Sequence, residues 1–452
     1  MTASARDGCD LLALHERHPQ RYPILLESVS GAANLGRFDV LFALPGARLT
    51  QLPDGTLTGR AQASTSSRFL DALDDWWRLE RCASGRSDAP FAGGWFLYLG
   101  YEMAAEVEPS LRLPPGRLPR AIAWRMHGAI VRDRVTGELL VCAESGQESA
   151  LRDQLRQDLA ALPVAPASPD SPAPLVTHRI VEQAPEIFLD GVRAALEAIG
   201  RGDVYQANLS RPWHATLAPE VTTTALYRAL RLANPAPFAG IAQFGGCAVL
   251  SSSPERLLRI EAGIASTRPI AGTRPRGADA DADASLVGEL RLNEKERAEH
   301  VMLVDLERND LGRICRPGTV RVDEYMTIET YATVHHIVSN VQGELRADVT
   351  PGQAIAAVFP GGTITGCPKV RCMQLLADFE RGPRDAYTGS MGYLGRDGTL
   401  DLNILIRTLL VQGADIEFRT GAGIVADSLP EAELAETRAK ARGMLRALGG
   451  EG

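Results

Sequence analysis

The stretch SMGYLGRDGTLDLNILIRTLLVQGADIEFRT, residues 390–420, indicates the fold of this chain. Apolar and β-branched residues make three strand-like runs in it, at 390–394, 404–410 and 416–420, and no helical pattern separates them. Elsewhere strands and helices interleave irregularly, without the even βαβ rhythm of a doubly wound sheet. We therefore predict an α+β fold, a large two-layer arrangement of antiparallel β-sheets packed together with helices outside.

Periodicity predicts further elements on both sides of this stretch. Apolar residues recur at helical spacing in residues 185–199, and Gly200 and Gly202 close that segment. Other helices are predicted at 69–79, 284–309 and 430–448. Other strands are predicted at 38–43, 94–100, 205–209 and 248–252.

The length of the chain, 452 residues, exceeds what one compact core usually holds, so we expect two lobes or one large two-layer domain. Residues 161–175 (ALPVAPASPDSPAPL) are rich in Pro, Ala and Ser, which is typical of a solvated linker. The linker would separate an N-terminal α+β region, residues 1–160, from a catalytic domain, residues 176–452.

Charge and cysteine usage exclude several classes of partner. The net charge of -8 argues against binding to nucleic acid or to an anionic membrane. No apolar run approaches about 18 residues and no N-terminal signal pattern is present, which predicts a cytoplasmic protein. The seven cysteines show neither zinc-ligand nor CxxC spacing, so we expect reduced, mostly buried thiols.

Lysine is rare in this chain: only three of its 48 basic Lys and Arg residues are lysines. They are Lys295, Lys369 and Lys440, all in the C-terminal half. A compact ammonium on a flexible stem is not equivalent to the planar guanidinium of Arg. We therefore expect a functional reason for at least two of the three.

Two pairs of glutamates have the spacing of a candidate metal site. Glu296 and Glu299 lie three apart on one predicted helix, and Glu433 and Glu436 lie three apart on another, so each pair shares a helical face. If the two faces oppose each other, four carboxylates converge on a hard cation such as Mg²⁺. The alternative is that each pair decorates a solvated helix, with Glu436 and Lys440 as an ordinary i,i+4 ion pair.

Capping residues and glycines suggest where anions could bind. Ser428 and Glu431 read as a capping box for the final helix. In residues 361–369 (GGTITGCPK) the Cys-Pro pair rules out a Walker A loop. Thr365 fits the N-cap of a helix, and Pro368 fits its first turn. The start of that helix would offer free amides to an anion. The glycine-rich residues 421–423 follow a strand and could serve a carboxylate. Arg407, within the apolar run 404–408, either points to solvent or faces a buried anion.

Several long motifs resemble those of the chorismate-utilising enzyme family. They are PIAGTRPRG (269–277), EHVMLVDLERNDLGRI (299–314), VHHIVSNVQGEL (334–345), GGTITGCPKVRCMQLL (361–376) and GAGIVADSLPEAELAETRAKA (421–441). The resemblance covers the chain from about Tyr205 to the C-terminus. Residues 25–28 (LLES) and 36–39 (GRFD) are similar to the amino-accepting branch of the family.

The resemblance implies a set of residue roles. Glu255 would be the general acid for the departing C4 hydroxyl, and His336 would lie beside the reacting ring. Tyr387 and Arg407 would hold the enolpyruvyl carboxylate of chorismate. The remaining implied substrate contacts are Thr363, Gly421, Ala422, Gly423 and Lys440. The implied ligands of Mg²⁺, which grips the ring carboxylate, are Glu296, Glu299, Glu433 and Glu436.

Gln206 narrows the activity within the family. Isochorismate and salicylate synthases carry a lysine at this position to activate water, and glutamine cannot act as a general base, which argues against both activities. Ala271 and Thr273 of the PIAGT motif complete the implied catalytic set. A non-catalytic chorismate- or tryptophan-binding homologue would be marked by loss of the acid or of a metal carboxylate, and all five glutamates are present.

Two amination products remain open on the sequence. The motifs at 205–209, 362–366, 387–393 and 401–403 look more like aminodeoxychorismate synthase component I, which aminates C4 toward p-aminobenzoate and folate. Many of those enzymes have lysine in a PIKGT motif, whereas here the position is Ala271, as in anthranilate synthase component I, which aminates C2. No Gly-x-Cys-x-Gly nucleophile turn is present, so we expect ammonia from solution or from a separate glutamine amidotransferase subunit.

Overall fold

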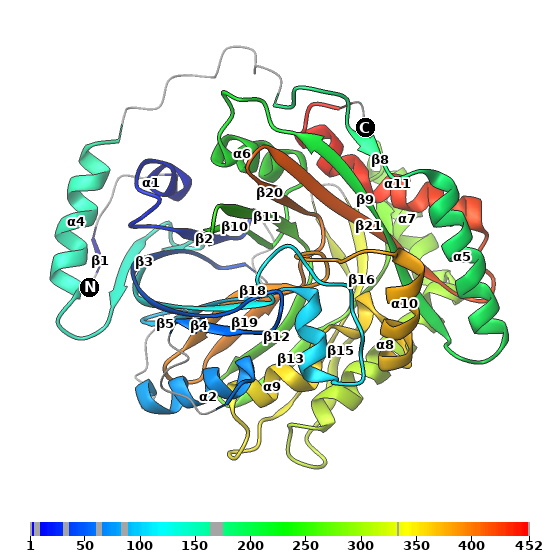
Figure 1. Cartoon of the computed structure of the whole chain (residues 1–452), viewed down its shortest axis with the longest axis horizontal. Helices are drawn as coiled ribbons and strands as arrows, with labels where there is room; N and C mark the ends of the chain where they lie inside the picture. Colours follow the sequence, from blue (N-terminus) through cyan, green and yellow to red (C-terminus); the bar gives the residue numbers. More distant parts are fainter. Residues whose placement is uncertain are drawn as a thin grey trace.

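The computed structural model describes residues 2–3, 10–29, 36–59, 66–82, 89–162, 175–331 and 334–450. Its strands form one hydrogen-bonded network, and every strand pairing in that described part of the chain is antiparallel (Figure 1). Together with the surrounding helices this confirms the predicted α+β fold.

The sheet has two halves that join at the long strands β3 and β6. The first half is, in spatial order, β9 (Gln206–Thr216), β21 (Asp415–Ile424), β20 (Thr408–Gln412), β11 (Cys247–Ser253), β10 (Phe238–Phe244), β2 (Ile24–Glu27) and β3 (Phe38–Gln51). The second half continues from β6 (Ala121–Asp133) through β5 (Gly94–Leu99), β18 (Ser390–Gly395), β19 (Leu400–Asn403), β12 (Arg256–Glu261), β13 (Ile264–Arg268) and β16 (Val334–Glu344). At its far edge β14 (Ile270–Pro275) and β15 (Arg321–Thr330) both pair with β16.

A shared apolar core holds the two halves face to face. One cluster of buried residues combines Val249 of β11 and Phe244 of β10 with Phe96 of β5 and Met391 of β18. Since the inner faces of both halves contribute to one core, the sheets form the two packed layers expected of this class. The short strands are β1 (Thr2–Ala3), β4 (Leu57–Gly59), β7 (Leu139–Ala143), β8 (Val181–Glu182) and β17 (Gly366–Cys367).

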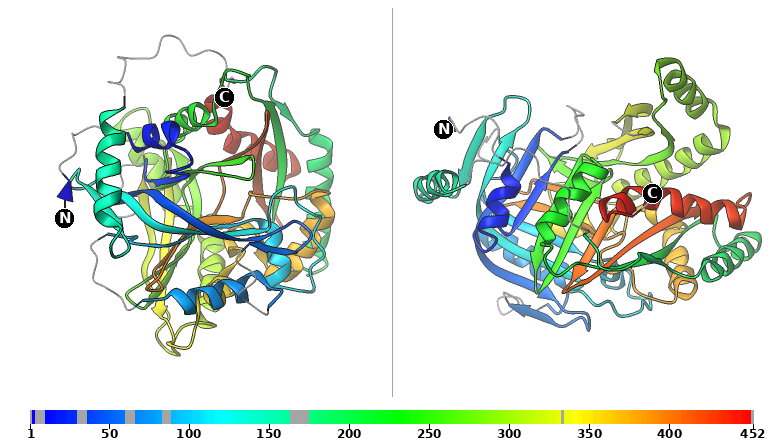
Figure 2. Two further views of the ribbon diagram at one scale, coloured as in Figure 1. Left: turned by 60° about the vertical axis from the view of Figure 1, so that its left-hand side comes forward. Right: turned by 90° about the horizontal axis from the view of Figure 1, so that it is seen from above.

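Helices cover the outside of these layers (Figure 2). They are α1 (Leu11–Arg17), α2 (Phe69–Glu80), α3 (Ala104–Val107), α4 (Glu148–Ala160), α5 (Pro185–Gly200), α6 (Thr223–Ala233), α7 (Ala280–Leu292), α8 (Glu294–Gly312), α9 (Pro351–Val358), α10 (Lys369–Glu380) and α11 (Pro430–Ala447), with 3₁₀ turns η2 (Tyr101–Met103) and η3 (Gly362–Ile364). α5 and α10 pack on β9, and α11 packs on β21. None of the helices in the described ranges is long and apolar enough to cross a membrane.

The helix predicted at 284–309 is two helices, α7 and α8, which meet at Asn293. Asn293 has an extended ψ of 104°, and its side-chain oxygen accepts a hydrogen bond from the Glu296 backbone N–H at 3.0 Å. An Asn side chain that satisfies a free amide in this way begins a new helix. We predicted one helix instead of two because the helices before and after this cap are both polar, so the sequence pattern does not change at Asn293.

The strand predicted at 404–410 is also broken. β19 ends at Asn403 and β20 begins at Thr408, and Arg407 between them has a left-handed φ of 51°. The backbone of Leu405 there bonds to a loop instead of a strand, since its N–H donates to Gly389 and its carbonyl accepts from Thr388. Residues 421–423, which we expected after a strand, lie inside β21 and pair with residues 208–210 of β9.

Two predicted caps are wrong. α11 begins after Leu429, which makes no side-chain cap, and the Ser428 hydroxyl accepts from the Val425 N–H at 3.1 Å. α10 begins after Pro368, while the buried Thr365 hydroxyl donates to the Gly361 carbonyl at 2.9 Å. In both places the hydroxyl bonds within the preceding loop, a competing use that Ser and Thr commonly make of nearby backbone groups.

Strands from before residue 160 are hydrogen-bonded to strands from after residue 176: β2 pairs with β10, and β5 pairs with β18. The domain boundaries at 1–160 and 176–452 stay a prediction, and most of the predicted linker, residues 163–174, lies outside the described residues. The six cysteines that the structure describes are free thiols, but only Cys315 and Cys372 are buried, so the expectation of mostly buried thiols is wrong.

Candidate active site

Glu255 is a buried carboxyl between β11 and β12. Its side chain is 5% exposed, and the Thr363 hydroxyl donates to its Oε1 at 2.7 Å. Burial raises the pKa of Glu255 to about 7, and the hydrogen bond from Thr363 opposes the rise only in part. A large fraction of the molecules therefore keep the Glu255 proton at neutral pH, which suits a general acid.

His336 lies on β16 opposite the β14 motif that carries Thr273. The Thr273 hydroxyl and the Nδ1 of His336 are 2.9 Å apart, and the ring is 2% exposed. Burial lowers the pKa of His336 to about 3, and the nearby charge of Arg407 adds to this. The imidazole is thus neutral at pH 7, and its Nε2 has no hydrogen-bond partner in the described part of the chain.

Arg407 occupies the left-handed turn between β19 and β20 and is half-buried. Its guanidinium makes neither an ion pair nor a hydrogen bond to any residue that the structure describes, and burial lowers its pKa. Its charge acts on both Glu255 and His336, so these three groups share one region. A cation that is partly removed from water and lacks an anion is unfavourable, so Arg407 fits a ligand carboxylate.

At Gly421 and Gly423 of β21, side chains from other parts of the chain pack directly against the strand backbone. A Cβ at Gly421 would lie 2.9 Å from the Tyr387 hydroxyl, and a Cβ at Gly423 would lie 2.5 Å from the Nε2 of Gln206. Lys440 on α11 donates from Nζ to the Gly421 carbonyl at 3.0 Å. Only glycine leaves room for these approaches, so the two glycines bring Tyr387, Gln206 and Lys440 to one strand.

Ala422 points the other way. Its side chain is 1% exposed and belongs to an apolar cluster with Phe188, Val192 and Leu434 under α5 and α11. Only the backbone of Ala422 remains available to a ligand on the opposite face of the strand.

The PIAGT motif lies next to Glu296, which belongs to the first pair of predicted metal ligands. Gly272 has a φ of +65° at a register shift of β14, and a Cβ there would lie 3.0 Å from Oε2 of Glu296. Ala271 itself is 9% exposed and pairs with Ile337 on β16. The motif therefore lies between His336 and Glu296.

The four predicted metal glutamates do not gather into one site. Among the residues described, no three or more His, Cys, Asp or Glu side chains form a group that could hold a metal ion. Oε1 of Glu296 accepts from Arg274 at 2.7 Å, and Glu436 pairs with Lys440 at 2.7 Å. The expected ion pair of Glu436 and Lys440 is therefore present, whereas the expected convergence of four carboxylates is not.

The donor chemistry of these glutamates still fits a hard cation. Oε2 of Glu296 is a buried oxygen with no hydrogen-bond partner in the described part of the chain. Buried carboxylate oxygens are rarely left without a partner, and oxygen-only donors are what Mg²⁺ prefers. The residues thus suit the ion, although the two pairs would have to come closer together to share it.

Comparison with known proteins shows the family to which this chain belongs. The family model for chorismate binding enzymes matches residues 45–446. Anthranilate synthase component 1 of Thermus thermophilus is 39% identical over 445 residues, which cover 97% of this chain and 94% of that protein. Aminodeoxychorismate synthase component 1 of Bacillus subtilis is 37% identical over 447 residues, which cover 95% and 92%.

The chain belongs to the chorismate-binding enzyme family. The crystal structure of anthranilate synthase component I from Streptococcus pneumoniae matches it with a TM-score of 0.80 at 31% identity, covering 90% of this chain and 92% of that one. The protein is thus a chorismate-utilising enzyme of the amino-transferring kind. The names of its relatives divide between the two products.

In this chorismate-binding enzyme, Lys369 has a structural partner that we had not predicted. Its Nζ donates to Oδ2 of Asp310 at 2.5 Å and to the Val358 carbonyl at 3.2 Å. The Lys369 ammonium is therefore used within the protein itself.

Arg384 is a second residue that sequence reasoning missed. Its guanidinium is buried and donates to the backbone carbonyls of Asn208 and Ile364 and, through an ion pair at 2.6 Å, to Glu380. It also stacks on Tyr387, 5.7 Å from the ring centroid. Arg384 therefore ties β9 and the Thr363 turn to Tyr387.

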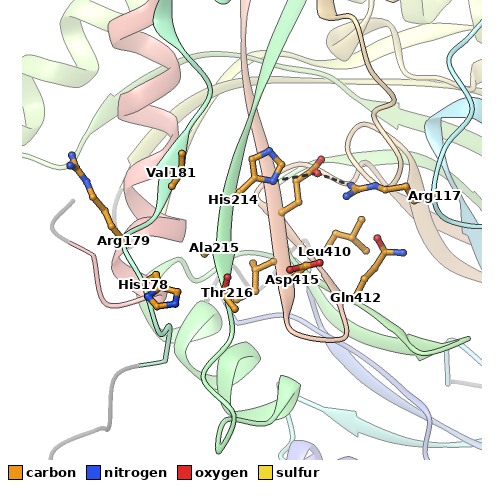
Figure 3. Close-up of a pocket in the computed structure, with 12 residues that line it drawn as sticks. Arg117, His178, Arg179, Val181, His214, Ala215, Thr216, Leu410, Gln412 and Asp415 are labelled. Atoms are coloured by element: carbon orange, nitrogen blue, oxygen red, sulfur yellow. Dashed lines mark hydrogen bonds and ion pairs between the residues drawn. The ribbon is translucent and has the colours of Figure 1, made fainter.

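Two cavities of the described structure are lined by other residues. A cavity of about 270 Å³ is lined by Arg117, His178, Arg179, His214, Gln412 and Asp415, and Figure 3 shows Arg117 and His214 both turned toward one carboxylate, Glu417. It contains no predicted site residue. A second cavity of about 190 Å³ is lined by Leu26, Glu27, Arg37, Phe38, Met391 and Asn403. The two N-terminal motifs of the amino-accepting branch thus meet at one cavity.

Proposed function

We propose that this enzyme aminates chorismate to 4-amino-4-deoxychorismate, toward p-aminobenzoate and folate, as component I of an aminodeoxychorismate synthase. The observation that carries the proposal is Glu255, a buried acid that has a pKa of about 7 and accepts a hydrogen bond from Thr363, together with Arg407, whose charge acts on Glu255 and which pairs with no anion in the described part of the chain. The choice of the C4 product rests on the motifs at 205–209, 362–366, 387–393 and 401–403.

The reaction needs an acid because hydroxide is a poor leaving group. Glu255 gives its proton to the C4 hydroxyl of chorismate, the C4–O bond breaks, and water leaves. Ammonia forms the new C–N bond and then loses one proton, which restores the acid. Chorismate and ammonia thus give aminodeoxychorismate and water, and Glu255 ends as it began.

Cationic and hydroxyl groups fix the substrate for this step. Arg407 and the Tyr387 hydroxyl bind the enolpyruvyl carboxylate, because Arg407 otherwise lacks an anion. Lys440 and the backbone at Gly421 and Gly423 contact the rest of the molecule. Glu296, Glu299, Glu433 and Glu436 would hold Mg²⁺, which would supply positive charge to neutralise the ring carboxylate.

A separate glutamine amidotransferase subunit supplies ammonia in this proposal. Two relatives carry names ending in component 1, which supports a partner subunit. The chain offers no glutaminase nucleophile motif of its own.

Anthranilate synthase component I is the second candidate, and Ala271 favours it. There ammonia would attack C2, the C4 hydroxyl would leave with the same proton from Glu255, and loss of pyruvate would make the ring aromatic. The neutral His336 lies where it could take part in that elimination.

One experiment separates the two products. Purified protein is incubated with chorismate, Mg²⁺ and ammonium, and the product is identified by mass and ultraviolet spectrum. We expect a non-aromatic C4-amino compound that a lyase converts to p-aminobenzoate. Fluorescent anthranilate as the main product would establish the second candidate, and no turnover would reject both.

A further inference from the structure

Glu307 is a buried carboxyl on α8 that has no part in the chemistry described above. It is 5% exposed, and its Oε1 lies 3.3 Å from the position of a Cβ at Gly362. Gly362 opens the turn η3, and Thr363, the next residue, holds Glu255 at 2.7 Å. Two buried carboxyls, Glu307 and Glu255, therefore approach the same turn.

No cation in the described part of the chain contacts Glu307. The Lys369 ammonium, whose charge acts on Glu307, is bonded to Asp310 at 2.5 Å, one helical turn further along α8. Glu307 makes no ion pair with any residue in the described ranges. Burial raises the pKa of Glu307 to about 7; the charge of Asp310 adds to the rise and that of Lys369 opposes it.

We propose that Glu307 is a positioning residue that acts on the reaction through Glu255. The charge of Glu307 sets the pH range over which Glu255 stays protonated. The inference rests on the proposed role of Glu255 as the acid. Two like charges in a low-dielectric interior disfavour each other, so ionised Glu307 makes it harder for Glu255 to lose its proton. Arg407 is the charged group that opposes this at Glu255, and the neutral His336 adds no charge.

The decisive variant is Glu307→Gln, which keeps size and hydrogen bonding but removes the charge. We expect the pKa of Glu255 to fall by about one unit. Turnover with ammonium is measured from pH 6 to 9, and the ratio of variant to wild type at each pH cancels the protonation of ammonia. The ratio should be about one half at pH 6 and fall to about one tenth above pH 8, because the variant loses the acid proton at lower pH.

Asp305→Asn is the matched control, since Asp305 lies on the same helix but is exposed and paired with Arg308 at 2.7 Å. Its ratio should be flat. A ratio for Glu307→Gln that is lowered equally at every pH would show a merely structural role and overturn the proposal.

A second measurement does not depend on turnover. The infrared carboxylic-acid band that is missing in Glu255→Gln reports the protonation of Glu255 directly. In Glu307→Gln that band should disappear at lower pH than in the wild type, and in Asp305→Asn at the same pH. An unmoved band would overturn the coupling, whereas a moved band in a protein that does not turn over chorismate would leave the coupling intact and reject the proposed function.

Discussion

At the scale of single residues, the site combines a carboxyl that is partly protonated at neutral pH with a guanidinium that has no anion in the described part of the chain. Burial raises the pKa of Glu255 and lowers that of Arg407. Each state is unfavourable in the free protein, and each suits the proposed bound state, in which chorismate brings a hydroxyl to be protonated and a carboxylate to be paired.

Glu255→Gln should lower turnover by about 100- to 10,000-fold, because the amide cannot protonate the leaving hydroxyl. In the wild type, the rate per free ammonia should fall as the pH rises through about 7, where Glu255 loses its proton. Steady-state rates divided by the calculated ammonia concentration measure both effects. A variant with wild-type turnover would remove Glu255 from the mechanism.

Ala271→Lys should place a primary amine beside the reacting ring and permit a covalent adduct with chorismate. The adduct needs the amine partly deprotonated, which the buried position favours, as Ala271 is only 9% exposed. Intact-protein mass spectrometry after incubation with chorismate detects it. The unmutated chain serves as the control and should form no adduct; an adduct there would contradict a route without covalent lysine catalysis.

At the scale of elements, the start of α8 positions a predicted metal ligand. Asn293 caps this helix on the N–H of Glu296, so the cap also orients the glutamate. Asn293→Ala should lower the free energy of unfolding by about 1 kcal/mol, whereas Asn293→Ser, which keeps an acceptor, should lose less. Urea unfolding of the three proteins compares them. Equal stability of the Ala and Ser variants would show that the cap contributes nothing.

The two glutamate pairs lie on different helices, α8 and α11, and do not meet in the described structure. A cation shared between them must offset the repulsion of four carboxylates and a substrate anion. Turnover should therefore vanish in EDTA and return with Mg²⁺, and Glu436→Gln should be severely impaired even at saturating Mg²⁺. Full activity in chelator would reject the metal site.

At the scale of the whole molecule, the chain contains an amination site but no recognisable glutaminase. The isolated protein should use ammonium, and the rate per total ammonium should change little from pH 7 to 9, because the gain in free ammonia is offset by the loss of protonated Glu255. It should use glutamine only with an amidotransferase subunit present. Product formation from glutamine by the pure chain would contradict this.

The sequence by itself determined the fold class and the positions of α2, α5 and α11, because periodicity and long ordered motifs are local properties. It predicted α5 and α11 to within one residue at each end. Only the tertiary structure decided that Arg407 lies in a turn between strands and that Lys369 pairs with Asp310. It also decided that the side chains of Tyr387 and Gln206 pack against Gly421 and Gly423. Glu255 and Glu307, 52 positions apart, approach one turn from different elements. The pKa of a buried carboxyl depends on neighbours that folding brings from elsewhere in the chain, and spacing along the sequence does not encode them.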